Sequence, residues 1–482
     1  MTSVPNLRQP SSGNNISILW LCIFVIGTAC FPSKKATKSK SADHTPPKKT
    51  SKPNEVPKID TVVWKEENPS KVKDVPKTEE KDKVVVKPKE TEKKTTPTTP
   101  GVPKKNTGKL MLPKEDSVYR IVALLPFKAN EMDTLSTRLP SGSERFVQYY
   151  CGMKMAVLEF ENELDKKLLL TVHDIQSNDV SKYVLEKYEK RPPHVIIGPY
   201  KSEAVKSSAT WAKEHESILI SPWVSSSTIA EQNPFYVQAK AGLYAHYKAI
   251  NDHARKYYPA SNIILISKSP EDSKIKFFND STQFSANISE QTIKEDELAN
   301  SQNPILTPFL KEDGPTVFIL PFASIKDENY IYHFLRRVSS EKANKDVIVY
   351  GMYKWIELKS DILDYVNTLK IRLSISNYFD NDESNIRAFK KRYFNTYREF
   401  PTEEALEGYD LMKYVVRSLK TNLYPFHWYS MGSMGNYLET EFNVSPVFKS
   451  SDQNKDPWNA DYFENSFVKI VEIRSNRYRV IE

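Results

Sequence analysis

The chain has 482 residues, a formal net charge of +8, 3 cysteines, 31 prolines and 13 glycines. The positive charge lies in residues 31–110, where 21 lysines against 11 acidic residues give +10; residues 1–30 add +1, so residues 111–482 carry −3. A nucleic-acid-binding domain needs Lys and Arg gathered on one folded face, so nucleic acid is not expected as a partner. Three cysteines without a CxxC spacing also exclude a disulfide framework.

The motifs of common enzyme classes do not occur in this chain. It contains no P-loop, no GxGxxG, no GxSxG elbow and no HExxH. The sequence therefore predicts no catalytic residue, no cofactor and no metal, and the protein is not expected to be an enzyme. His246 and His253 lie seven residues apart on a predicted helix, but no third ligand is near, so two ordinary surface histidines are expected.

Residues 1–30 resemble a bacterial lipoprotein signal peptide. An apolar segment at 16–26 has the length of a signal h-region, and Gly27, Thr28 and Ala29 lead directly to Cys30. Gly27 stands where a lipobox usually has leucine, and a plain signal peptide or a single membrane anchor is the alternative. We expect Cys30 to be lipidated. No acidic residue follows it closely, which favours an anchor that faces the periplasm. The expected location is the cell envelope, at the outer membrane, and the sequence leaves the inner membrane open as the alternative.

Residues 31–116 are rich in Lys, Pro, Thr and Glu and almost lack aromatic residues. Such a segment cannot bury enough apolar area to offset its conformational entropy, so it is predicted to be a disordered tether. About 80 residues give an r.m.s. reach on the order of 50 Å. A solvated spacer is the simpler interpretation, and contact of the lysines with acidic envelope polymers is the alternative.

Residues 117–482 alternate buried strands with amphipathic helices. Short apolar runs predict strands at 119–127, 167–174, 194–198, 217–221, 262–266, 315–320 and 346–351. Apolar residues at helical spacing predict helices at 146–164 and 180–190, one that follows 199–202, and one around 331–338. The end of the chain reads as a hairpin around Ser475 and Asn476. This alternation predicts an α/β fold with parallel sheets, and so many strands need two lobes.

The order of these segments resembles the type I periplasmic binding proteins, the group of branched-chain amino-acid receptors. The resemblance is carried by VALLPF at 122–127, GMKMAV at 152–157, VIIGPYKSEA at 195–204, ILISPWVSSS at 218–227, NPFYVQ at 233–238, FKKRYF at 389–394 and GYDL at 408–411. It implies two Rossmann-like lobes joined by hinge crossings: lobe one at about 117–240 and 375–425, lobe two at about 241–374 and 426–482. The chain looks most similar to Bacteroidetes envelope proteins that carry a LysM module, although no LysM is recognisable here.

A ligand in such a fold lies at the carboxyl ends of the strands. This rule selects Phe127 and residues 199–202, 222–226 and 352–355, and the predicted ligand-binding residues are Tyr200, Ser202, Trp223, Ser225 and Tyr353. Ser202 is expected to cap the helix that follows, and Tyr200 and Trp223 to form an apolar or stacking wall. Ser202 acting only as a cap, and Trp223 packing only on its own lobe, are the alternatives.

The first crossing, residues 239–244, contains no acidic residue, whereas the amino-acid receptors carry there an acid that pairs with the ligand ammonium. Lys240 in its place favours an anionic or neutral ligand, or none. The predicted function is a tethered binding lipoprotein for a small molecule, in ABC-type transport or sensing. The alternative is a degenerate binding-protein fold that binds an envelope protein and regulates cell-envelope or peptidoglycan synthesis.

Overall fold

The computed structural model describes residues 118–481 apart from 134, 136, 137, 177, 281, 301, 359–363, 422, 430–436, 439, 451–454, 475 and 476. All of them belong to the unit Pro97–Glu482. The predicted signal peptide, Cys30 and the tether lie outside the described residues, so these predictions stay predictions. Within the described part, no helix combines the length and hydropathy that a membrane span requires.

The first lobe contains a seven-stranded sheet in the order β11-β12-β5-β4-β3-β1-β2. Its strands are β1 (Val118–Leu125), β2 (Lys167–Asp174), β3 (Val195–Ile197), β4 (Ile218–Ser221), β5 (Tyr236–Gln238), β11 (Val444–Val447) and β12 (Tyr462–Asn465). Neighbouring strands run parallel except for β11, which pairs with β12 in the antiparallel direction.

Helices cover both faces of this sheet. They are α2 (Glu144–Phe160), α9 (Ser384–Tyr397) and α10 (Glu403–Lys420) on one face, and α3 (Asn178–Glu186) and α4 (Ser202–Glu214) on the other. Along β1, Ile121 and Ala123 belong to the core under α2 and α10, whereas Val122 and Leu124 belong to the core under α3 and α4. A strand buried on both faces is apolar throughout, which explains the continuous apolar run in the sequence.

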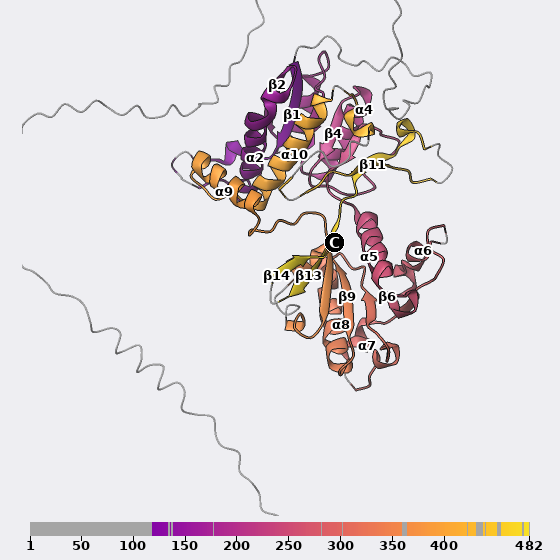
Figure 1. Cartoon of the computed structure of the whole chain (residues 1–482). Coiled ribbons are helices and arrows are strands. Elements are labelled where there is room, and N and C mark those ends of the chain that lie inside the picture. Colours follow the sequence, from indigo (N-terminus) through magenta and orange to yellow (C-terminus); the bar gives the residue numbers. More distant parts are fainter. Residues whose placement is uncertain are drawn as a thin grey trace, which may run out of the picture. The chain divides into compact units, whose positions relative to one another are not determined.

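The helices α2 and α10 lie side by side (Figure 1). Two glycines allow them to pack closely against each other. A Cβ atom at Gly152 would lie 1.9 Å from the carbonyl oxygen of Ala405, and one at Gly408 would lie 2.1 Å from that of Tyr149. Both positions therefore need glycine because the facing atoms are backbone atoms that cannot turn aside.

The second lobe contains another seven-stranded sheet, in the order β14-β13-β10-β9-β8-β6-β7. Its strands are β6 (Ile263–Ser267), β7 (Ser289–Thr292), β8 (Thr316–Ile319), β9 (Val347–Met352), β10 (Lys370–Ile375), β13 (Lys469–Arg474) and β14 (Arg477–Val480). The helices of this lobe are α5 (Leu243–Tyr257), α6 (Ile275–Phe278), α7 (Glu295–Ala299) and α8 (Glu328–Glu341).

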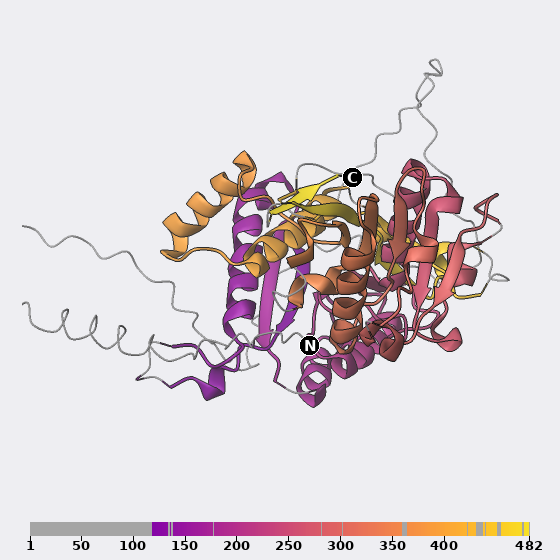
Figure 2. The same cartoon turned by 90° about the horizontal axis from the view of Figure 1, so that it is seen from below.

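The parallel strands of the second sheet end in an antiparallel edge. β10 pairs with β13 and β13 with β14, both antiparallel, so the predicted C-terminal hairpin is confirmed. The yellow C-terminal strands accordingly lie beside the orange strands of this sheet (Figure 2). Short 3-10 helices complete the described part: η1 (Ala129–Glu131), η2 (Glu161–Glu163), η3 (Ala260–Asn262), η4 (Pro270–Asp272), η5 (Thr307–Phe309), η6 (Ile325–Asp327), η7 (Tyr353–Glu357), η9 (Phe426–Trp428) and η10 (Pro457–Asn459).

The described elements pass between the two lobes three times, after β5, after β10 and after β12. The prediction that 426–482 belongs entirely to the second lobe is wrong for the part that contains β11 and β12. β12 pairs with β5 of the first sheet, and only β13 and β14 join the second. The physical reason is that β5 would otherwise leave an unpaired edge, which β12 covers.

His246 and His253 are buried, so the prediction that they are surface residues is wrong. Nδ1 of His246 lies 3.0 Å from Oγ of Ser374, and Nδ1 of His253 lies 2.6 Å from the hydroxyl of Tyr350. Each ring bonds a different strand under α5, so the pair helps attach this helix to the sheet. Among the described residues, no cluster of three or more His, Cys, Asp or Glu side chains is placed to hold a metal.

Candidate functional site

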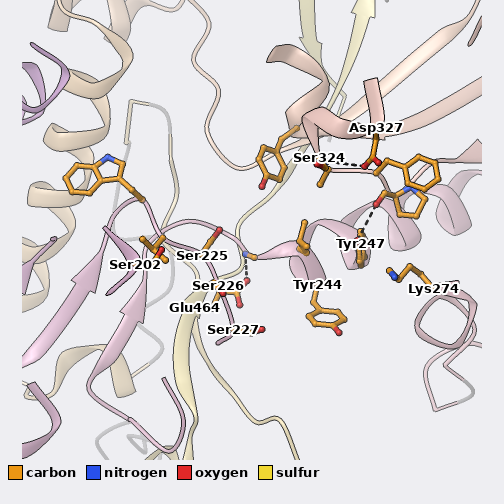
Figure 3. Close-up of a pocket in the computed structure, with 18 of the residues that line it drawn as sticks. Ser202, Ser225, Ser226, Ser227, Tyr244, Tyr247, Lys274, Ser324, Asp327 and Glu464 are labelled. Atoms are coloured by element: carbon orange, nitrogen blue, oxygen red, sulfur yellow. Dashed lines mark hydrogen bonds between the residues drawn. The ribbon is translucent and has the colours of Figure 1, made fainter. Parts of the chain in front are cut away.

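A pocket of about 920 Å³ lies between the carboxyl ends of the strands of both lobes. All five residues that the sequence selected, Tyr200, Ser202, Trp223, Ser225 and Tyr353, line it. Figure 3 shows Ser202, Ser225, Ser226 and Ser227 on the side of the first lobe, and Tyr244, Tyr247, Lys274, Ser324 and Asp327 on the side of the second. Phe127, which the same rule selected, packs against Tyr150 and does not line the pocket.

The turn after β3 positions Tyr200 and Ser202. Gly198 has φ +89°, and a Cβ atom there would lie 2.5 Å from the carbonyl oxygen of Leu124, so only glycine fits this turn. α4 begins at Ser202, and Lys201 before it makes no side-chain capping hydrogen bond. The prediction that Ser202 caps the helix is therefore wrong, because this residue is already the first residue of the helix and its hydroxyl faces the pocket region instead.

Trp223 combines the two roles that the sequence left open. Its ring packs on its own lobe, with centroids 4.9 Å from Tyr149, 5.3 Å from Phe146 and 5.8 Å from Tyr200, and it also borders the pocket. Tyr200 is 38% exposed, and the guanidinium of Arg145 lies 4.3 Å from its ring centroid. These contacts hold an aromatic wall in a fixed orientation beside the pocket.

The serine loop, residues 225–227, follows β4, and a side chain of β5 holds it in place. The side-chain amide of Gln238 donates to the carbonyl of Ser226 at 2.8 Å, and the hydroxyls of Ser226 and Thr228 lie 2.8 Å apart. Among the described residues, the hydroxyls of Ser225 and Ser227 make no hydrogen bond, so both remain available at the pocket surface.

The second lobe supplies residues that the sequence analysis missed. Lys268 follows β6 and forms an ion pair with Asp327, while its ammonium lies 5.0 Å from the ring centroid of Phe322. The hydroxyl of Tyr247 donates to the carbonyl of Pro321 at 3.3 Å, and burial raises the pKa of this tyrosine to about 12. The sequence contained a signal for part of this side: the rule on carboxyl ends also applies to the predicted strands 262–266 and 315–320, which Lys268 and Phe322 follow. Tyr247 lies on α5 and follows neither strand.

Tyr353 lies at the start of η7, directly after β9. Its ring lies over His246, with centroids 4.7 Å apart. Burial lowers the pKa of His246 to about 4, so the ring under Tyr353 is neutral at pH 7. Tyr353 therefore rests on an uncharged, fixed support.

The pocket contains an acid that the crossing at 239–244 lacks. Glu464, from β12, accepts a hydrogen bond from the backbone amide of Gly242 at 2.5 Å, and burial raises the pKa of its carboxyl. Lys240 points elsewhere, toward Glu407 at 2.8 Å, and does not line this pocket. Lys240 therefore does not contact this pocket, and the pairing of β12 with β5 places a carboxyl group at the crossing instead. The expectation of an anionic or neutral ligand stays a prediction.

Comparison with solved structures shows a similar fold. A protein described as a branched-chain amino acid ABC transporter from Rhodospirillum rubrum matches with a TM-score of 0.52 and 13% identity, over 76% of this chain and 100% of that one. The chain has the two-lobed α/β fold of the type I periplasmic binding proteins. An ABC transporter substrate-binding protein from Desulfitobacterium hafniense matches at 12% identity over 76% and 100%, with a TM-score of 0.48.

No family model and no curated protein matches this chain. At 13% identity the likeness to binding proteins establishes the fold, and it carries no information on the ligand. In the type I binding-protein fold two lobes face each other across a cleft, and the pocket described above lies in that place.

Proposed function

We propose that this protein is a binding protein of the cell envelope that takes a small molecule into the cleft between its two lobes, for transport or sensing. The observation that supports this most directly is a pocket of about 920 Å³ lined by residues from both lobes. Ligand pockets are usually 300–1,000 Å³, mostly preformed, and carry a few polar groups among aromatic walls. A ligand in this pocket contacts both lobes at once and favours their closure.

The role is binding and not catalysis. The pocket offers serines, tyrosines, three lysines and three acids, and Lys268 pairs with Asp327, but no histidine or cysteine is among the described residues that line it. The solved structures with this fold are named as transport proteins and not as enzymes, which agrees with such a role.

The anchoring part of the proposal rests on the sequence. Cys30 is the proposed lipidation site, 31–116 the proposed tether, and the outer membrane facing the periplasm the proposed location. A lipid-anchored domain on a spacer stays near the membrane while its cleft remains accessible to diffusing ligands.

A thermal-shift screen of the purified chain against envelope small molecules tests the function. A ligand at a hundred times its dissociation constant stabilises the folded state by about 2.7 kcal/mol. Trp223→Ala and Ser202→Ala should weaken the shift that a bound compound produces. Trp458→Ala and Ser207→Ala are the matched controls, because Trp458 lines a different pocket of the first lobe and Ser207 bonds only its own helix.

The proposal is supported if a compound raises the melting temperature and the two cleft variants reduce this shift while the controls keep it. It is overturned if no compound acts while cross-linking shows one envelope protein bound through this domain. That result would indicate an interaction module in place of a receptor.

A further inference from the structure

The lining of the cleft is unusually rich in hydroxyl groups. Of its 23 residues, ten carry a hydroxyl, and these are five serines and five tyrosines: Ser202, Ser225, Ser226, Ser227, Ser324, Tyr200, Tyr244, Tyr247, Tyr353 and Tyr462. Most of the serines come from the first lobe, and most of the tyrosines from the second (Figure 3). A hydroxyl can both donate and accept, so this lining suits a ligand whose polar groups also do both.

Several of these hydroxyls are available for hydrogen bonds with a ligand. Ser225 and Ser227 make no side-chain hydrogen bond among the described residues, and neither does Tyr244, whose side chain is 63% exposed at the start of α5. Tyr247 donates to Pro321, which leaves its oxygen free to accept. The two sides of the cleft thus present free hydroxyls toward the same space.

The charges of the lining cancel. Three lysines, Lys201, Lys268 and Lys274, stand with three acids, Asp272, Asp327 and Glu464, so the formal sum is zero. The ion pair of Lys268 with Asp327 neutralises both, and Glu464 is engaged by the Gly242 amide while burial disfavours its charge. Lys201, Lys274 and Asp272 form no ion pair among the described residues, so the lining keeps charges of both signs and favours neither a net anion nor a net cation.

The cleft has few aliphatic side chains against which a branched aliphatic ligand could pack. Among them, Leu243 is 44% exposed. The apolar surface is aromatic instead, with Trp223, Phe322 and the tyrosine rings. Aromatic faces together with hydroxyls suit rings that present a C–H face and carry hydroxyl groups.

From these observations we infer that the cleft binds an uncharged, polyhydroxylated ligand of the saccharide class, with its hydroxyls bonded by Ser225 and Ser227 on one side and by Tyr244 and Tyr247 on the other. The inference rests on the proposed function of the same cleft and names its ligand class. A volume of about 920 Å³ has room for more than one sugar ring.

Isothermal titration of the purified full chain with three defined sets of compounds tests this inference. The first set contains neutral mono- to tetrasaccharides of hexoses and N-acetylhexosamines, the second leucine, isoleucine and valine, and the third citrate and inorganic phosphate. At least one saccharide should bind, and it should bind more tightly than every compound of the other two sets.

Variants then test the contacts with the bound saccharide. Ser225→Ala, Ser227→Ala and Tyr244→Phe each remove one hydroxyl and should weaken binding about fivefold to tenfold. Ser207→Ala, which bonds only within α4, should leave the affinity unchanged. Unaltered melting temperatures of the free variants would show that the loss is not a folding defect.

Two outcomes overturn the inference in different ways. Tighter binding of leucine or of an anion than of any saccharide overturns the ligand class but leaves the binding function intact. Binding of nothing from the three sets overturns the class, and the thermal-shift screen above then decides whether the function falls with it. Saccharide binding that the three hydroxyl variants do not weaken overturns the assigned contacts.

Discussion

The ammonium of Lys240 lies 2.8 Å from a carboxylate oxygen of Glu407, and the side-chain amide of Asn377 donates to the same oxygen at 2.5 Å. Lys240 belongs to the crossing after β5 and Asn377 to the crossing after β10, whereas Glu407 lies on α10 of the first lobe. One carboxylate therefore connects two crossings to the body of a lobe. A change at this carboxylate should affect the stability of the hinge and not the lining of the cleft.

Glu407→Gln should lower the free energy of unfolding by about 1–2 kcal/mol, because it removes the charge that pairs with a largely buried ammonium. The Lys240 side chain is 32% exposed, so part of the loss is recovered by solvent. Denaturant unfolding measures the difference. Glu312→Gln is the control. The Glu312 side chain is 84% exposed, so its ion pair with Lys345 should contribute less than about 0.5 kcal/mol. Equal effects of the two variants would contradict a structural role of the hinge carboxylate.

Acid should destabilise the domain through its buried histidines. Burial lowers the pKa of His246 to about 4 and that of His427 to about 3, against about 6.5 in the unfolded chain. Because the unfolded state then binds protons more readily, the stability is complete above pH 6.5 and is lost as the pH falls toward the folded pKa. Between pH 6.5 and 5, each histidine should lower the free energy of unfolding by about 2 kcal/mol.

His246→Asn removes one of these proton sites. Between pH 7 and 5, the free energy of unfolding of this variant should therefore fall by about 2 kcal/mol less than that of the parent chain. Denaturant unfolding at a series of pH values measures this slope, and the comparison is independent of any loss of stability at pH 7. A variant whose slope equals that of the parent chain would show that His246 is not the group responsible.

Gly152→Ala should be severely destabilising, by about 3 kcal/mol or more, although alanine favours helices. The new methyl group would meet the backbone of α10 at Ala405, and neither backbone can move without separating the two helices. Thermal unfolding followed by circular dichroism measures the loss. Leu158→Ala, an exposed change on the same helix, should remain within about 0.5 kcal/mol of the parent chain. Near-parent stability of Gly152→Ala would mean that α2 and α10 pack less closely than described.

Cys30→Ala tests the proposed lipid anchor. The variant should either persist as an unprocessed precursor or leave the membrane fraction, because acyl chains provide most of the anchoring energy. Fractionation with metabolic labelling by a fatty-acid analogue measures both. Cys22→Ala, in the same apolar segment, is the matched control and should keep the label. Labelling and membrane recovery that are unchanged in Cys30→Ala would exclude this site.

Local patterns in the sequence were sufficient for much of the fold. Continuous apolar runs marked β1, β3, β4, β6, β8 and β9 because strands buried on both faces have no polar side. The rule on strand ends brought Tyr200, Ser202, Trp223, Ser225 and Tyr353 to one pocket without any knowledge of contacts. The rule was not applied to the strands β6 and β8, so the pocket residues that follow them were missed.

The sequence by itself determined the class of the fold, the two lobes and half of the cleft, because apolar periodicity and turn residues act within a few positions of the chain. Only the tertiary structure decided the charge of the cleft. β11 and β12 have only four residues each, and Ser and Pro interrupt the first while Glu and Asn end the second, so their lobe depends on which sheet edge is free to pair. That pairing brings Glu464 to Gly242, which is 222 residues away in the sequence. No local sequence pattern predicts a contact over such a separation.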